Sequence, residues 1–321
     1  MFPIARLRRL VSALGASDDV PAAEAASELQ RRYAALLEGD LANVDAGLYP
    51  RELLFQIPFG RYAWALPKLL SDLPAVFKRI SARDHRDLPT EAQPERYPPY
   101  YRRNFHWQTD GYLSRRSAEI YDVSVELLFA GTADVMRRQI IPPISRALVG
   151  RNPETTRLLD IGCGTGRSLA QIATAHPRLP LTGLDISPYY LHEARSVLDD
   201  VSDVSLIAEN AEDMPFRDGY FAIATSVFLF HELPRTVRRG VLAEAHRVLQ
   251  PGGLLVVADS AQLAESGSLA FFLGRFARNF HEPFYREYVE DDLAEALAEV
   301  GFEVEAVEPH FVSKVVIARK S

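Results

Sequence analysis

The second half of the chain alternates between short, continuous apolar runs and longer stretches in which apolar residues recur at helical spacing. The first pattern predicts buried strands and the second predicts amphipathic helices. We therefore predict strands near residues 156–161, 181–185, 204–208, 221–227 and 253–259, and helices near residues 166–176, 188–199 and 235–249. Such alternation is typical of an α/β protein whose parallel sheet is covered by helices on both faces.

The C-terminal tail departs from this alternation. A helix is predicted near residues 289–300, followed by strands near 302–308 and 312–319 with only a short turn at Glu308 to His310 between them. Two strands joined so closely form a hairpin, so the last strand is expected to run antiparallel. Together with the earlier strands, this predicts a seven-stranded, mostly parallel sheet with an antiparallel last strand.

The N-terminal part has no such strands. Residues 4–82 and 114–149 carry apolar residues at helical spacing and are predicted to be helical. Prolines at positions 50, 58, 67 and 74 are expected to break the first region into short helices, because proline lacks a backbone donor and clashes with the preceding turn.

Between these helical regions, residues 83–110 are rich in proline and aromatic residues. Side chains such as Tyr100, Tyr101, Phe105 and Trp107 are costly to leave in water, so we expect this segment to pack over the α/β domain. We divide the chain into a helical N-terminal extension, residues 1–110, in which residues 83–110 form a lid or partner surface, and an α/β domain, residues 111–321.

Composition and charge limit the classes of protein. The 47% hydrophobic and 25% charged residues are typical of an ordinary globular enzyme. A net charge of -7 argues against nucleic acid as a partner, since general attraction to phosphates requires a basic surface. The single cysteine, Cys163, excludes an internal disulfide and a cysteine-rich metal cage, and it fits a reducing, cytoplasmic location.

No apolar run of the sequence is long enough to span a bilayer. The first predicted helix is basic and amphipathic, with Arg6, Arg8 and Arg9 beside apolar residues. Peripheral contact with a membrane surface therefore stays open, next to the alternative that this helix packs on its own domain.

One segment concentrates the candidate chemistry. Residues 158–167 read LLDIGCGTGR, in which an apolar strand leads into Gly162, Gly164 and Gly166 and then into a helix. A second apolar run ends at Asp185, at the spacing where a carboxylate meets ribose hydroxyls in a βαβ unit. The two features predict an adenosine site at the carboxyl edge of the sheet.

The glycine pattern also indicates which adenosine compound binds. A dinucleotide fingerprint needs a third glycine or alanine, yet counting from Gly162 and from Gly164 that position holds Arg167 and Leu169. S-adenosylmethionine has no phosphates and needs only the tight turn and close backbone approach that glycines allow. We therefore predict S-adenosylmethionine as the cofactor.

Five segments resemble class I S-adenosylmethionine-dependent methyltransferases in order and spacing, most closely the branch of ubiquinone/menaquinone-biosynthesis C-methyltransferases (methyltransferase type 11). They read LLDIGCGTGRSL, GLDIS, NAEDMPF, FAIATSVFLFHELP and PGGLLVVADS. The resemblance covers residues 155–320 and implies a Rossmann-like methyltransferase fold and a small-molecule acceptor. It does not extend to residues 1–110.

Two carboxylates are the leading candidates for cofactor contacts. Asp160, at the end of the first strand, can orient the glycine turn or receive the cofactor's ammonium group, or it can be satisfied by turn amides alone. Asp185 is expected to accept hydrogen bonds from both ribose hydroxyls.

Further contacts are implied by the resemblance. Asn210 stands where the family usually has an acid that accepts from the adenine amino group, and Ala211 would offer its backbone amide to the neighbouring ring nitrogen. Ile186 and Ser226 are expected to border the same site. Tyr121 matches a tyrosine that closes over the cofactor, although a buried helix contact explains it equally well.

Two His-Glu pairs follow strand ends on the edge where open α/β sheets bind substrates. They are His231 with Glu232, beyond the fourth strand, and His281 with Glu282, beyond the fifth. His231, His281 and Glu232 are the candidate catalytic groups, as bases or orienting groups, with structural hydrogen bonding as the alternative. No metal site is predicted, because no ligand set shows a recognisable spacing.

Residues 269–288 add aromatic side chains that either wall an acceptor pocket or pack as core. They are Phe271, Phe272, Phe276, Phe280, Phe284 and Tyr285. The sequence thus predicts O- or C-methylation of a small, aromatic or apolar acceptor. A protein of this fold that binds the cofactor as a scaffold, regulator or catalyst of another reaction stays an alternative, and an NAD(P)-dependent oxidoreductase is a less favoured one.

Overall fold

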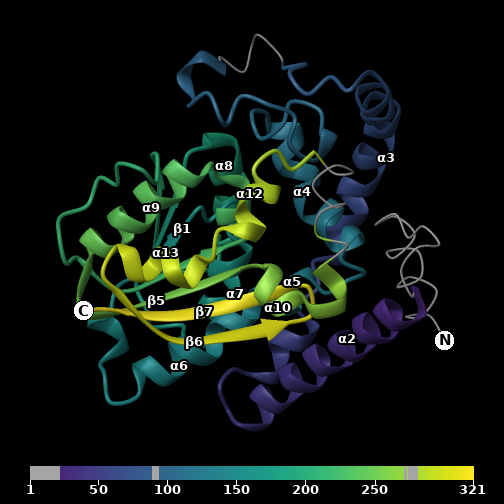
Figure 1. The fold of residues 1–321 in the computed structure, drawn as a ribbon. Coiled ribbons are helices and arrows are strands. Elements are labelled where there is room, and N and C mark those ends of the chain that lie inside the picture. The colour runs from purple at the N-terminus through teal and green to yellow at the C-terminus, as the bar shows by residue number, and fades with distance from the viewer. Residues whose placement is uncertain (1–21, 89–93, 271–272, 274–280) are drawn as a thin grey trace.

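A computed structural model describes residues 22–88, 94–270, 273 and 281–321. Seven strands of this described part form one sheet in the order β3-β2-β1-β4-β5-β7-β6 (Figure 1). The strands are β1 (Leu158–Ile161), β2 (Leu181–Asp185), β3 (Val204–Ala208), β4 (Phe221–Val227), β5 (Leu249–Ser260), β6 (Phe302–His310) and β7 (Ser313–Lys320). Because β7 runs antiparallel to both β5 and β6, the predicted seven-stranded sheet with an antiparallel last strand is confirmed.

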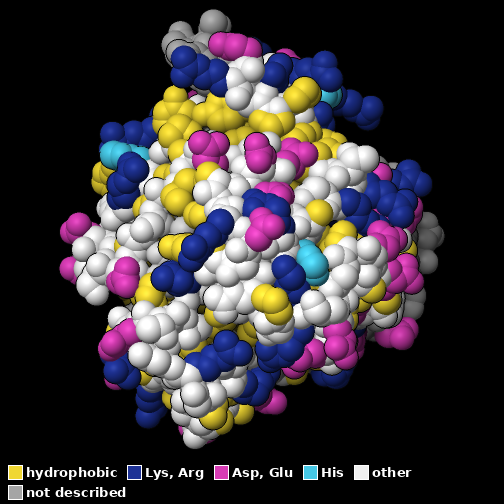
Figure 2. All heavy atoms as spheres, turned by 90° about the vertical axis from the view of Figure 1, so that its left-hand side faces the viewer, with side chains coloured by type: hydrophobic (Ala, Val, Ile, Leu, Met, Phe, Trp, Pro, Cys, Tyr) yellow, Lys and Arg dark blue, Asp and Glu magenta, His cyan; other side chains and the backbone are white. Residues whose placement is uncertain are grey.

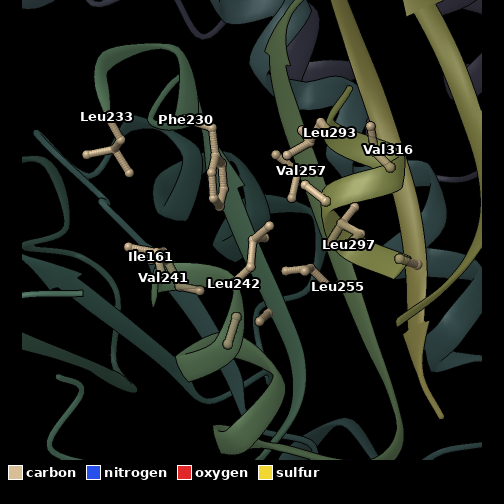
Figure 3. Packing of buried hydrophobic residues seen from close by; sticks show 14 of the residues in the cluster. Ile161, Phe230, Leu233, Val241, Leu242, Leu255, Val257, Leu293, Leu297 and Val316 are labelled. Atoms are coloured by element: carbon tan, nitrogen blue, oxygen red, sulfur yellow. The ribbon is translucent and has the colours of Figure 1, made fainter. Parts of the chain in front are cut away.

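Helices cover both faces of the sheet. Alternate strand residues point to opposite sides, so each face carries apolar side chains that a helix layer buries. One apolar cluster joins Leu255 and Val257 of β5 to the helices α9 (Arg235–Val248) and α13 (Leu293–Glu299), as Figure 3 shows. The alternate residues of the same strand, Leu254 and Val256, belong to a second cluster on the opposite face. That cluster contains the helices α6 (Ile141–Leu148), α7 (Arg167–Ala175) and α8 (Pro188–Val197).

Three longer N-terminal helices stand beside this domain: α2 (Ala22–Asp45), α3 (Phe59–Ala82) and α4 (Arg115–Leu128). Helix α3 runs unbroken through Pro67 and Pro74, so the prediction that these prolines break it is wrong. Tertiary contacts hold the helix instead. Arg79 donates a hydrogen bond to the carbonyl of Trp107 (3.0 Å), and α3 packs along α4.

Other boundaries also differ from the pattern-based prediction. The region 114–149 is helical as predicted and contains α4, α5 (Ala133–Arg137) and α6; the chain turns between α4 and α5 at Gly131, with a positive φ of 83°. The helix predicted at 289–300 is split into α12 (Tyr285–Glu290) and α13, because Asp291 pairs with Arg238 and Asp292 caps α13. The β6–β7 turn lies at residues 311–312.

Segment 94–110 lies over the carboxyl edge of the sheet. It includes the short helices η3 (Pro94–Arg96) and η4 (Phe105–Trp107). Tyr100 donates a hydrogen bond to Glu212 (2.9 Å), and Phe105 and Trp107 are buried. The aromatic residues of this segment are therefore packed against the α/β domain.

The described residues contain no helix with the length and apolar character needed to cross a membrane. On the face shown in Figure 2, acidic and basic side chains are interspersed rather than gathered by sign. The basic amphipathic helix predicted around Arg6, Arg8 and Arg9 lies outside the described residues.

Candidate active site

Two cavities lie at the carboxyl edge of the sheet. The first follows the ends of β1, β2 and β4 and is bordered by Gly162, Gly164, Asp185, Ile186 and Ala211. This is the edge at which open α/β sheets bind their ligands. Together with Asn210 and Tyr121, seven of the residues predicted to contact the cofactor thus meet around one hollow, which we call the donor pocket.

Backbone geometry opens the donor pocket at the glycine turn. Gly162 and Gly164 adopt positive φ angles of 71° and 53°, a region that costs other residues strain. A side chain at position 162 would also approach Leu229 to within 3.0 Å. Gly166, with a φ of 77°, has a different role. A side chain there would clash with Ala194 and Leu198, so this glycine allows α7 to pack closely against α8.

Asp185 borders the donor pocket and is fixed by two backbone amides. Its carboxylate accepts hydrogen bonds from the amides of Gly164 (2.9 Å) and Ser187 (2.8 Å). Burial raises the pKa of Asp185 to about 6, because the two amides only partly offset the loss of water. Additional hydrogen-bond donors would stabilise the ionised form of this buried carboxylate, and the two neighbouring hydroxyls of a ribose can supply them.

Asn210 and Ala211 lie on the same wall. The Asn210 amide oxygen accepts from the backbone amide of Glu212 (3.0 Å), and its amide nitrogen donates to the Glu212 carboxylate (3.2 Å). The side chain is thus already engaged in a local turn, and any contact to adenine would share its oxygen.

Besides Gly166, two predicted contacts are not on the wall of the donor pocket: Asp160 and Ser226. Asp160 is buried behind the turn and accepts a hydrogen bond from Thr225 (2.7 Å), with a pKa raised by burial to about 7. Ser226 is buried and donates to the carbonyl of Ile161 (3.0 Å). Both side chains therefore brace β1 against β4.

Aromatic side chains close the donor pocket. Tyr121 on α4 meets Tyr112 and Tyr190 edge to face, with ring centroids 5.9 Å and 5.5 Å apart, and Tyr100 and Tyr101 complete the wall. Of these, sequence reasoning named only Tyr121 as a cofactor contact. Tyr100, Tyr101 and Tyr112 come from the segment before α4, and Tyr190 comes from α8. The periodicity of the sequence does not reveal that these parts of the chain meet in the fold.

The second cavity is larger, about 520 Å³, and almost wholly apolar; we call it the acceptor cavity. Its walls come from α3 and α4, with residues such as Leu69, Leu73 and Val125, and from Leu269 and Tyr285 after β5. Of the aromatic residues predicted to wall a pocket, Tyr285 does so and Phe284 instead packs against Arg103. Phe271, Phe272, Phe276 and Phe280 lie outside the described residues.

The two cavities share three bordering residues: Tyr121, Phe228 and Glu232. Phe228 has a positive φ of 58°, a strained conformation for a bulky residue, at the end of β4. The donor pocket and the acceptor cavity therefore meet at one junction.

Polar side chains gather at this junction. His231 and His106 border the acceptor cavity beside Glu232, whose carboxylate accepts from the Tyr112 hydroxyl (2.5 Å). The Nδ1 atom of His231 lies 2.7 Å from Asp259. Burial opposes the charge of His231, but its carboxylate neighbours Asp259, Glu282 and Glu232 outweigh it and raise the pKa to about 10.

The second predicted His-Glu pair is divided by the structure. His281 lies between the rings of His85 and Trp107, at centroid distances of 4.7 Å and 4.9 Å, and borders neither cavity. Burial, together with nearby His85, lowers its pKa to about 4. Its neighbour Glu282 points instead to His106, with Oε1 3.1 Å from Nδ1. The structure thus does not bring His281 to the junction.

Comparisons with known proteins agree with this site. A family model described as a methyltransferase domain matches residues 158–253. A demethylmenaquinone methyltransferase of Thermotoga maritima is 31% identical over 219 residues, which cover 63% of this chain and 90% of that protein. An O-methyltransferase of Aspergillus nomiae is 35% identical over 151 residues, 46% of this chain and 64% of the relative. The chain thus spans less than two thirds of that relative's length.

Among solved structures, a putative methyltransferase from Bacillus halodurans aligns with a TM-score of 0.44 and 18% identity, over 55% of this chain and 98% of that one. The sequence matches define the class of protein: the chain belongs to the class I S-adenosylmethionine-dependent methyltransferases. S-adenosylmethionine is the cofactor of this family, and the glycine turn and Asp185 fit its adenosine.

Proposed function

We propose that the protein transfers a methyl group from S-adenosylmethionine to an oxygen or carbon atom of a small, mainly apolar acceptor. The observation that carries this proposal is the junction of the donor pocket with the apolar acceptor cavity at Tyr121, Phe228 and Glu232. Two reactants held on either side of one junction are oriented for direct displacement.

The donor pocket would hold the cofactor through its own backbone and one carboxylate. Asp185 would accept from the ribose hydroxyls, Gly162 and Gly164 would allow close approach, and the wall of Asn210 and Ala211 would receive the adenine. Asp160, Gly166 and Ser226 would support this pocket from behind. When bound, S-adenosylmethionine supplies an electrophilic methyl group on a sulfonium.

The acceptor cavity favours an apolar molecule with a polar group at one end. His106, His231 and Glu232 lie at its junction end, whereas α3 and α4 supply mostly leucine, isoleucine and valine. Burying the apolar body there would place the polar end beside His231 and Glu232. We further propose that the helical N-terminal extension serves as the lid that keeps water from this cavity.

The chemistry needs little beyond orientation when the acceptor is nucleophilic. For a hydroxyl acceptor, Nε2 of the His231 imidazolium would donate to the reacting oxygen while the Glu232 carboxylate takes the hydroxyl proton. The oxygen–methyl bond forms as the methyl–sulfur bond breaks, and the released thioether is neutral. The relatives named above include both an O-methyltransferase and a demethylmenaquinone methyltransferase, which supports oxygen or carbon as the atom methylated.

The test has two stages. Calorimetric titrations with S-adenosylhomocysteine and with NADH are expected to give binding of the first only. Labelled S-adenosylmethionine is then incubated with the protein and a panel of apolar phenols, hydroquinones and long-chain acids, and labelled product is sought by chromatography. Binding without labelled product, also in a whole-metabolite extract, would favour a cofactor-binding scaffold, and binding of NADH alone would overturn the proposal.

A further inference from the structure

A set of metal-ligand side chains comes together at the junction from three distant segments of the chain. His106 lies in η4, Glu232 in the short helix η7 (Phe230–Glu232) after β4, and Glu282 just before α12. One ligand atom from each lies within 4.8 Å of the other two. The His106 ring stands between the carboxylates, with Nδ1 3.1 Å from Glu282 and Nε2 3.4 Å from Glu232.

Within the described residues, the carboxylate of Glu282 has no hydrogen-bond donor of its own. Its side chain is fully shielded from solvent, and neither carboxylate oxygen makes a hydrogen bond of good geometry with any described group. A buried carboxylate without hydrogen bonds is strongly unfavourable, so such groups are normally paired or bound to a metal ion. The 3.1 Å contact to His106 is the nearest compensation.

The charges around the set leave room for a cation. Three carboxylates, of Asp259, Glu232 and Glu282, face two imidazoles. Asp259 is already satisfied, because it accepts from His231 and from the backbone amides of Phe230 and Ser260. Glu282 has no such donors, so Glu232 and Glu282, with the His106 ring between them, are the carboxylates left to bind a cation.

We propose that His106, Glu232 and Glu282 bind one divalent transition-metal ion at the junction of the two cavities. One imidazole with two carboxylates is a mixed nitrogen and oxygen set, which suits Mn²⁺, Fe²⁺ or Zn²⁺ better than the all-oxygen preference of Mg²⁺. Three protein ligands leave coordination positions open, and His106 and Glu232 border the acceptor cavity. The ion would therefore take an oxygen atom of the acceptor as a further ligand.

Metal binding is measured directly on the full-length protein. After treatment with EDTA and dialysis, the protein is equilibrated with Mn²⁺ or Zn²⁺ and bound metal is counted by atomic emission, with affinity from calorimetry. We expect one equivalent per chain, and a loss of about 100-fold or more in affinity for Glu282→Gln and His106→Gln. Glu308→Gln is the matched control, because Glu308 forms a more exposed pair with His310 (3.6 Å) and should leave the stoichiometry unchanged.

The fold of each variant is checked by S-adenosylhomocysteine binding, since the donor pocket does not include His106 or Glu282. Wild-type protein that takes up no Mn²⁺ or Zn²⁺ on equilibration would overturn the metal site. Equal metal affinity in the wild type and all variants would overturn it as well. The metal site is tested by binding and the proposed function by product formation, so the two can fail separately: wild-type protein that takes up no metal but still transfers methyl would refute the ion and leave transfer standing.

Discussion

The Nδ1 atom of His231 lies 2.7 Å from an Asp259 oxygen, and both side chains are buried at the carboxyl edge of the sheet. Asp259 also accepts from the backbone amides of Phe230 and Ser260, each at 2.7 Å, so its carboxylate cannot turn away. This fixes the His231 ring on the wall of the acceptor cavity. A histidine oriented through one nitrogen by a buried carboxylate leaves its other nitrogen for the substrate.

Asp259→Asn is therefore expected to damage catalysis more than binding. The amide keeps the shape of the side chain but removes the charge that holds the imidazole, so kcat should fall on the order of 10²-fold while the KM of the acceptor changes little. Steady-state kinetics give this split, and S-adenosylhomocysteine affinity should stay at the wild-type value. An unchanged kcat would remove His231 from the proposed chemistry.

Asp185→Ala should abolish most cofactor affinity and leave the fold intact. The substitution removes a carboxylate expected to accept two hydrogen bonds, and bonds to charged groups contribute about 1.5–3 kcal/mol each, so the loss should be about 100-fold or more. Calorimetry with S-adenosylhomocysteine measures it, with the exposed Asp203→Ala as control. Undiminished affinity would mean that Asp185 does not contact the ribose.

Cofactor affinity should also depend on pH below neutrality. The pKa of Asp185 is raised to about 6 in the free protein, and ribose hydroxyls that donate to its ionised form would lower that pKa in the complex. Binding must then release a proton at pH values below about 6. The affinity for S-adenosylhomocysteine should thus be flat well above pH 6 and fall by up to about tenfold per pH unit below it.

A variant pair assigns this pH dependence. Asp160, with a pKa of about 7, also titrates nearby and must be separated from Asp185. Titrations at several pH values should show the slope abolished in Asp185→Asn and preserved in Asp160→Asn. If Asp185→Asn keeps the slope, another group causes it.

The sheet and the donor pocket follow from local sequence signals. Apolar strand runs, glycines at positive φ and a carboxylate at the end of β2 depend on a few neighbouring residues, so Gly162, Gly164 and Asp185 could be placed without a structure. The predicted role of Asp160 on the pocket wall is less local. Its orientation depends on Thr225 of the adjacent strand, which chain spacing does not reveal.

The junction could not be predicted for the same reason. Its polar set joins residues of η4, η7 and the segment before α12, and only the three-dimensional fold brings His106 to Glu232 and Glu282. Adjacent residues in the chain can also separate, as His281 does from Glu282 by turning toward Trp107. Helix α3 stays unbroken because tertiary contacts outweigh the local cost of its two prolines. Helix propensity, which depends on the local sequence alone, does not include these contacts.

Filling the acceptor cavity should block the acceptor and spare the cofactor. Leu73, on α3, borders this cavity but not the donor pocket, so Leu73→Trp adds bulk where the apolar body of the acceptor is expected to lie. We expect the KM of an apolar acceptor to rise about tenfold or more, because a displaced apolar group forfeits burial of about 25 cal/mol per Å². S-adenosylhomocysteine affinity should not change, and Val149→Trp, at a position 82% exposed, serves as the control. Kinetics with acceptors of increasing length test the geometry further: the longest should suffer most, and an equal effect on all lengths would show that the acceptor binds elsewhere.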